Sequence, residues 1–224
     1  MADISNPNPA ALQRGSPVAP ALAVADPAPL GLAAFALTTF VLSVHNAGWA
    51  PDVIWVGLAI FYGGLAQFLA GMWEFRNRNV FGATAFSTYG AFWLSLGIFV
   101  VLILAVPTIG AAAVGKTGNG VDDGVAWFLL AFAIFNTYML LWSTRVSVAV
   151  FLVFLTLEIT EVLLFVGGFM HQGPVYAGAG FTWVNAGGIM GVVTAATAWY
   201  ASAAGVVNGQ AGRKVLPVGA PMWS

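Results

Sequence analysis

The sequence contains no cysteine and few charged residues. Only 7% of its 224 residues are charged, and seven basic against eight acidic side chains give a net charge of −1. Without cysteine, the chain has no disulfide, no thiol catalysis and no thiolate metal site. A nearly balanced charge also offers no basic surface for nucleic acid. We therefore expect no nucleic-acid partner.

Histidine is almost as scarce. His45 and His171 are the two histidines of the chain, and they lie far apart, each near the end of an apolar run. A histidine metal site needs several such ligands close together. We find neither a nucleophile–base pair nor a cofactor motif in the sequence, so we expect no metal, no cofactor and no enzymatic activity.

Long apolar runs dominate what is present. Hydrophobic residues make up 60% of the chain, and they gather in six runs: 30–50, 53–73, 83–106, 124–143, 147–169 and 181–205. A helix of about 20 residues spans the hydrocarbon core of a bilayer. The pattern predicts an all-α, polytopic membrane protein, a bundle of six transmembrane helices over residues 26–208. Residues 1–25 are predicted to be a disordered N-terminal tail, and residues 209–224 a cytoplasmic C-terminal tail.

The basic residues are divided unequally between the two sides of such a bundle. Six fall on one side, and the other side has one basic residue with three aspartates: Arg14, Arg76, Arg78, Arg145, Arg213 and Lys214 against Lys116, Asp52, Asp122 and Asp123. Basic residues are retained on the cytoplasmic side of membranes. Both termini are therefore predicted to be cytoplasmic, in a plasma-membrane protein, and the connection 107–123 is expected to be a flexible outer loop.

Tryptophans cluster near the predicted membrane interfaces. Six of the nine fall there: Trp49, Trp55, Trp73, Trp127, Trp142 and Trp183. Tryptophan favours this depth because its ring is apolar and its N–H is polar. We interpret these residues as anchors at the headgroup level.

Polar side chains inside the apolar runs mark candidates for a substrate path. They are Thr38, Thr39, Asn46, Gln67, Thr84, Ser87, Thr88 and Asn136. A polar group in hydrocarbon is costly unless it has a partner or faces water, so several such faces in one bundle would form a narrow polar passage. Thr38 and Thr39 have an alternative interpretation, in which each hydroxyl bonds the carbonyl one turn back.

Two acidic residues fall inside the fifth run. Glu158 and Glu161 are three residues apart and so lie on nearly the same helical face. Carboxylates at this depth are costly and often functional, which favours a proton-linked or cation site. The alternative is that they bond neighbouring hydroxyls or lie at a subunit interface.

Several motifs occur together in a recognisable order. They are residues 26–32 (DPAPLGL), His45-Asn46, Phe61-Tyr62-Gly63-Gly64 with Gln67, Gly71 with Glu74, Phe81-Gly82, residues 86–90 (FSTYG) with Phe92-Trp93, and residues 212–217 (GRKVLP). This series resembles the acetate uptake transporter family, which includes bacterial succinate–acetate permeases and their fungal relatives. The family signature usually opens with Asn, where this chain has Asp26. The resemblance covers the chain from Asp26 to about residue 219.

The resemblance implies a homo-hexamer in which each protomer has its own pore for acetate and other small carboxylates such as succinate. It also implies a hydrophobic constriction made by a Phe, a Tyr and a Leu, which correspond here to Phe35, Tyr89 and Leu155. Two alternatives stay open. One is transport of ammonium or another small solute, since some fungal relatives are linked to ammonia export, and the other is a membrane acetate sensor.

Overall fold

The computed structural model describes residues 24–50, 53–115, 118–176 and 180–223. Arg14, Asp52, Lys116 and nearly all of the expected N-terminal tail lie outside these ranges. The elements are α1 (Ala28–Asn46), α2 (Trp55–Ile60), the π-helix η1 (Phe61–Ala66), α3 (Gln67–Arg76), α4 (Val80–Ala105), α5 (Pro107–Val114), α6 (Gly120–Ser143), α7 (Val148–Phe169) and α8 (Trp183–Ala211). The described part of the chain is thus largely helical, as the sequence predicted.

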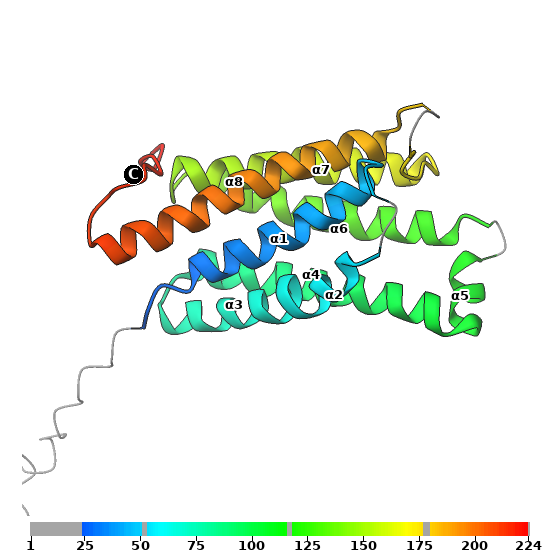
Figure 1. Cartoon of the computed structure of the whole chain (residues 1–224), viewed down its shortest axis with the longest axis horizontal. Coiled ribbons are helices and arrows are strands. Elements are labelled where there is room, and N and C mark those ends of the chain that lie inside the picture. Colours follow the sequence, from blue (N-terminus) through cyan, green and yellow to red (C-terminus); the bar gives the residue numbers. More distant parts are fainter. Residues whose placement is uncertain (1–23, 51–52, 116–117, 177–179, 224) are drawn as a thin grey trace, which may run out of the picture.

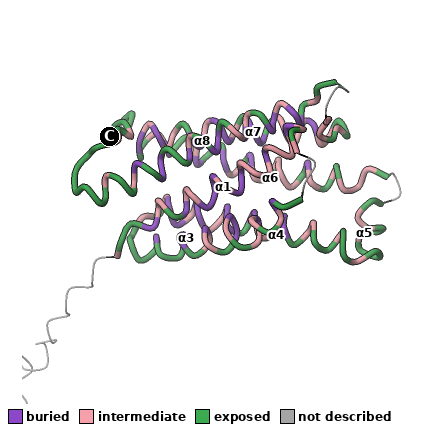
Figure 2. Tube along the Cα trace, in the orientation of Figure 1, coloured by how far each residue is buried: buried purple, intermediate pink, exposed green. Residues whose placement is uncertain are grey.

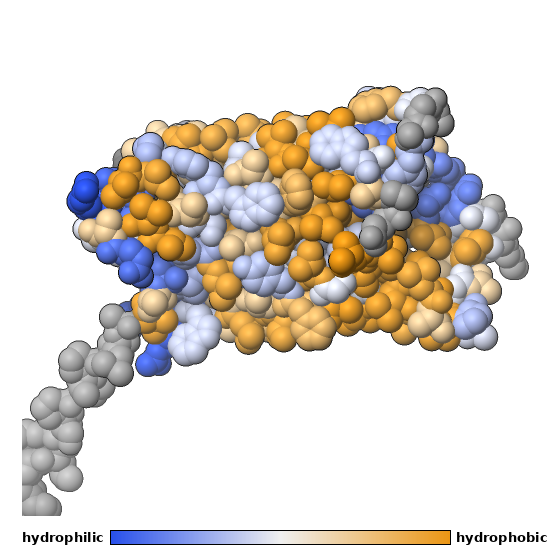
Figure 3. Space-filling view, viewed as in Figure 1, coloured by the Kyte–Doolittle hydropathy of each residue, from blue (hydrophilic) through white to orange (hydrophobic). Residues whose placement is uncertain are grey.

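Six stretches are long and apolar enough to cross a bilayer. Five of them are single helices. The other one, Trp55–Arg76, is the second along the chain and is built from α2, η1 and α3 in succession. Figure 3 shows a largely hydrophobic band along the molecule with hydrophilic patches toward its two ends. These features confirm a multi-pass membrane protein with six spans.

Helix α1 occupies the middle of the bundle. It packs against α8 on one side and against η1 and α3 on the other, while α7 packs against both α6 and α8 (Figure 1). Buried residues lie where these helices face one another, and exposed residues follow the outer surface (Figure 2). The candidate site lies in this interior, chiefly between α1, α4, α6 and α7.

Side-chain caps fix where three of the helices begin. The amide of Gly82 donates to Asn79 before α4, and the amide of Val150 donates to Ser147 before α7. At α8, Thr182 and Asn185 form a reciprocal capping box. Each cap satisfies an amide that the helix itself leaves free, which stabilises that starting point.

Glycines allow the closest helix approaches. A Cβ on Gly188 of α8 would overlap the backbone of Asn46 and Ala47 at the end of α1. A Cβ on Gly71 of α3 would lie 2.5 Å from the backbone nitrogen of Ser87 in α4. Only the missing side chain permits these contacts, so both glycines set the spacing of the bundle.

The connection 107–123 is mostly helical rather than a flexible loop, so that expectation was wrong. Pro107 begins α5, where its fixed φ and missing N–H suit a first helical position. Gly115, with φ of +68°, ends the helix. Helix α6 already begins at Gly120, and Figure 1 shows α5 turned across the end of the bundle.

The predicted C-terminal tail begins within a helix and then packs against the bundle. Helix α8 continues to Ala211, and the chain then folds back over the start of α7. The amide of Ala149 donates to the carbonyl of Val218 at 2.9 Å, and the amide of Met222 donates to the carbonyl of Thr144 at 2.8 Å. The first of these bonds satisfies the Ala149 amide, which lies in the first turn of α7.

Candidate functional site: a constricted passage

Two cavities lie one behind the other inside the bundle. The larger, about 270 Å³, extends from the loop after α7, at Gln172 and Pro174, past Asn46 to Tyr89 in the middle of the bundle. The smaller, about 30 Å³, lies beyond Tyr89 and is lined by Gln67 and Phe154 among others. A passage through the bundle would have to join these two spaces.

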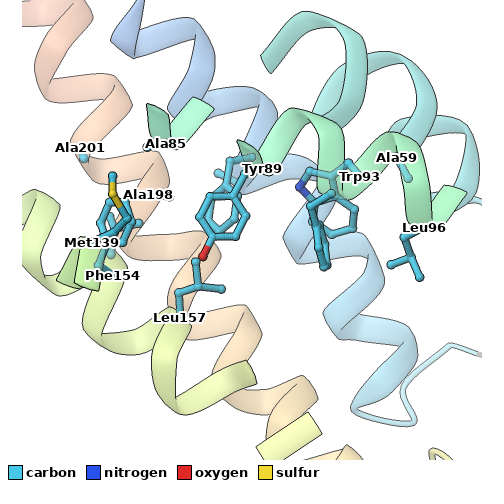
Figure 4. Close-up of a cluster of buried hydrophobic side chains, with 14 of the residues drawn as sticks. Ala59, Ala85, Tyr89, Trp93, Leu96, Met139, Phe154, Leu157, Ala198 and Ala201 are labelled. Carbon is cyan, nitrogen blue, oxygen red and sulfur yellow. The ribbon is translucent and has the colours of Figure 1, made fainter. Parts of the chain in front are cut away.

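Three side chains line both cavities and so stand between them. They are Phe35 of α1, Tyr89 of α4 and Leu157 of α7, and each is at least nine-tenths buried. The rings of Phe35 and Tyr89 meet edge to face with centroids 5.8 Å apart. Figure 4 shows the Tyr89 hydroxyl pointing toward α7, the helix that carries Leu157. The three make an apolar constriction.

The structure places Leu157, not Leu155, at this point. Leu155 is only partly buried and lines neither cavity in the described part of the chain. Two residues along an α-helix correspond to a rotation of roughly 200°, so the two leucines face nearly opposite ways. Between the two cavities, α7 therefore presents Leu157, and Leu155, expected from the family pattern, faces elsewhere.

Three of the residues that line the larger cavity each have a buried hydrogen-bond donor without a partner among the described residues. The donors are the hydroxyl of Thr39 and the indole nitrogens of Trp55 and Trp93. All three side chains are more than nine-tenths buried. Figure 4 shows the Trp93 nitrogen on the side of its ring nearer Tyr89. A buried donor left unpaired costs about 1–3 kcal/mol, so these groups favour a ligand or water that supplies acceptor atoms.

The role of the two tryptophans was not recognised from the sequence. Trp55 was interpreted as an interfacial anchor, but it is 6% exposed, whereas Trp142 is 59% exposed and does lie on the outer surface. For Trp93 a signal existed, because it follows Tyr89 by four residues and therefore shares its helical face. For Trp55 the sequence gave no such signal.

The candidate path residues separate into two groups. Thr39 and Asn46 line the larger cavity and Gln67 lines the smaller one. The remaining five line neither cavity among the described residues: Thr38, Thr84, Ser87, Thr88 and Asn136. The hydroxyl of Thr38 donates to the carbonyl of Ala34 at 2.9 Å, as its alternative interpretation required.

Asn136 lines neither described cavity and instead bonds to Tyr89, one of the three residues between them. Its Oδ1 accepts a hydrogen bond from the Tyr89 hydroxyl at 2.9 Å. Its Nδ2 donates to the carbonyl of Phe154 at 3.0 Å and to Oε2 of Glu158 at 2.7 Å. Asn136 thus ties Tyr89 of α4 to α7 and fixes the position of the phenol ring.

Glu158 and Glu161 lie in different surroundings. Glu158 is half-buried, and its Oε1 accepts from the hydroxyl of Thr137 at 2.8 Å. Glu161 is 3% exposed and lines the larger cavity. Its Oε1 lies 3.3 Å from the Tyr89 hydroxyl, and its Oε2 has no partner among the described residues. Glu158 therefore fits the interpretation of a carboxylate bonded to neighbouring groups, and Glu161 the interpretation of a site residue.

A model of the GPR1/FUN34/yaaH family matches residues 9–220. The chain belongs to this family. The family comprises transporters and channels rather than enzymes, as the sequence predicted.

Two relatives and one solved structure show how far the family similarity extends. Acetate permease A of Emericella nidulans is 41% identical over 206 residues, which cover 89% of this chain and 67% of the relative. The succinate-acetate/proton symporter SatP of Escherichia coli is 36% identical over 197 residues, covering 88% and 96%. The structure of the bacterial acetate channel SatP matches with a TM-score of 0.74 at 34% identity, covering 88% of this chain and all of that one. The family, its fold and its six-span architecture are therefore shared along most of the chain.

Proposed function

We propose that the protein conducts acetate, and other small carboxylates such as succinate, through a pore in each protomer. The observation that carries this proposal is the pair of cavities that meet at Phe35, Tyr89 and Leu157. An apolar ring of this kind excludes water when closed and selects by width, so it suits a solute as small as acetate. The names of the relatives point to the same substrates.

The chemistry of the larger cavity suits a carboxylate. Thr39, Trp55 and Trp93 supply donors for carboxylate oxygens, and apolar walls such as Phe92 and Leu96 suit a methyl group. No lysine or arginine lines this cavity in the part of the chain that the structure describes. Neutral donors can replace the hydration of an anion without the strong attraction of a fixed cation, which would slow its release.

The setting in the membrane is part of the same proposal. Arg76, Arg78, Arg145, Arg213 and Lys214 are exposed and flank helix ends on the side of the bundle where α1 begins. This distribution supports cytoplasmic termini in the plasma membrane. The larger cavity then faces outward. We further expect the ring-like homo-hexamer that the family resemblance implies.

Ammonium is the second candidate, because one feature of the cavity favours a cation. The unpaired Oε2 of Glu161 is an acceptor, and aromatic faces attract ammonium ions. Three unpaired donors in the same cavity oppose that choice.

Uptake of labelled acetate into proteoliposomes tests the proposal. Purified protein should raise acetate uptake well above that of protein-free liposomes, and excess succinate should compete. Uptake measured with and without a pH gradient separates passive conduction from coupling to protons. If labelled methylammonium entered through the protein and labelled acetate did not, the carboxylate assignment would be wrong.

A further inference from the structure

We propose that Glu161 is the proton-binding residue of the passage, and that a carboxylate occupies the larger cavity only while Glu161 carries a proton. This inference rests on the proposed function. Four observations support it: the position of Glu161 on the cavity wall, its burial, its unpaired oxygen, and the number of hydrogens available around Tyr89.

The hydrogen-bond donors of Asn136 are already committed. Both neighbours of its Nδ2, the carbonyl of Phe154 and the carboxylate of Glu158, are acceptors. The orientation of the amide is therefore fixed, and Oδ1 faces the Tyr89 hydroxyl. Because a carboxamide oxygen can only accept, the short contact of 2.9 Å uses the hydrogen of the Tyr89 hydroxyl.

A phenol has one hydrogen, so its second contact needs another donor. The Tyr89 oxygen also lies 3.3 Å from Oε1 of Glu161. While Tyr89 donates to Asn136, this second contact is satisfied if Glu161 is protonated and donates to the phenol oxygen. An ionised Glu161 would compete with Asn136 for the same hydrogen. The arrangement therefore has a natural place for one proton on Glu161.

The charges that face Glu161 do not compensate for an ionised carboxylate. Glu158 lies one turn away on α7, and Asp122 of α6 lines the same cavity. His45 of α1 also lines the cavity, and its Nδ1 is hydrogen-bonded to the hydroxyl of Tyr176 in the loop after α7. Neither α2 nor α8 contributes an acidic or basic side chain. No lysine or arginine is present on the described cavity wall, so no fixed cation there would balance an anionic Glu161.

A bound carboxylate substrate makes the ionised form of Glu161 still less favourable. Two anions in one enclosed cavity repel each other, and the repulsion is strong where water is scarce. Protonation of Glu161 removes that repulsion and leaves Thr39, Trp55 and Trp93 to the substrate. Binding of the proton and of the carboxylate must then promote each other by the same factor. The proton comes from water in the cavity, and only an O–H bond forms or breaks.

The principal test is the pH dependence of acetate flux in Glu161→Gln. Glutamine is isosteric with the protonated acid and can still donate to the Tyr89 oxygen. At constant acetate anion concentration, wild-type flux should fall as pH rises, by up to about tenfold per pH unit once Glu161 releases its proton. After subtraction of protein-free liposomes, Glu161→Gln should change less than about twofold across the same range.

Asp123→Asn is the matched control. Asp123 lies at the same end of the bundle, bonds His171 and does not line the larger cavity. This variant should retain the wild-type fall in flux. If Glu161→Gln retained it as well, the assignment of the proton to Glu161 would be overturned.

Infrared spectroscopy of the wild-type protein tests the proton site without relying on a folded variant. The carbonyl stretch of a protonated carboxylic acid should be present, should disappear as pH rises, and should shift when acetate is added. Absence of any such band, or its persistence in a folded Glu161→Gln, would refute the proposal. If the band behaved as expected while no acetate flux occurred, the transport function would fail and the proton site would stand.

Discussion

The hydroxyl of Tyr89 donates to Oδ1 of Asn136 across 2.9 Å, joining α4 to α6 beside the boundary between the two cavities. Both residues are buried, and Asn136 is completely so. The phenol ring that separates the two cavities is therefore held by a polar partner that no solute touches. Rigidity of the constriction depends on this second layer of residues as much as on the apolar ring itself.

Replacing Asn136 by alanine should weaken both the fold and the constriction. The variant loses the hydrogen bonds to Tyr89, Phe154 and Glu158 and leaves the buried Tyr89 hydroxyl with only its longer contact to Glu161. We expect the free energy of unfolding to fall by about 1–3 kcal/mol, measured by thermal denaturation in detergent. In a double-mutant cycle with Tyr89→Phe, the coupling should be about 0.5–1.5 kcal/mol. Strict additivity of the two substitutions would show that this bond does not stabilise the protein.

Shortening Leu157 should widen the passage. In Leu157→Ala we expect acetate flux to rise several-fold and longer monocarboxylates such as butyrate to enter, because the apolar ring sets the width. Leu155→Ala removes the same atoms from a residue that lines neither described cavity, so its selectivity should match wild type. The measurement is competition of butyrate with labelled acetate in proteoliposomes. A larger effect at Leu155 would place the constriction on the other side of α7.

Trp93→Phe should affect binding of acetate more than stability. Its indole nitrogen has no described protein partner, so replacing the ring by a smaller aromatic one removes a donor from the cavity without breaking a bond inside the protein. Loss of one hydrogen bond of about 0.5–1.5 kcal/mol predicts acetate affinity that is two- to tenfold weaker. The half-saturating acetate concentration for uptake reports this change.

The control for this prediction is Trp142→Phe on the outer surface, which should leave the half-saturating concentration unchanged. Equal losses of affinity in the two variants would argue against a donor role for Trp93.

Gly188→Ala should destabilise the protein, since a methyl group there meets the backbone of Asn46 and Ala47. Forcing atoms into such a contact typically costs about 1–3 kcal/mol. Gly209→Ala, in the same helix but with nothing within 4 Å of the added Cβ, should instead gain up to about 1 kcal/mol from helix propensity. The comparison uses the melting temperatures of the purified variants in one detergent. A stable Gly188→Ala would mean that α1 and α8 can separate freely.

Hydrophobic run length was enough to predict the six spans, because the hydrocarbon thickness allows few alternatives. The same argument could not resolve shorter features. Helix α5 was missed because its eight residues lie in a connection rich in glycine, where a proline at the first helical position was the principal signal. The rotation of α7 was missed because both leucines share a helical face with a carboxylate: Leu155 precedes Glu158 by three residues, and Leu157 precedes Glu161 by four.

The polar residues inside the apolar runs predicted only part of the candidate site. A buried polar side chain can face a cavity, as Gln67 does, or hold another residue in place, as Asn136 does. The sequence shows that each needs a partner but not which kind. Tryptophan is common at the membrane surface, but the side chain of Trp55 is buried inside the bundle.

The π-helix η1 has a geometric consequence for the passage. Trp55 and Gln67 are 12 residues apart, and in an uninterrupted α-helix their side chains would diverge by roughly 120°. A wide turn accommodates about one additional residue, which reduces that divergence to roughly 20°. One span can thereby present Trp55 to the larger cavity and Gln67 to the smaller one. Removing a single residue from the wide turn would rotate one of these two groups away from the conduit.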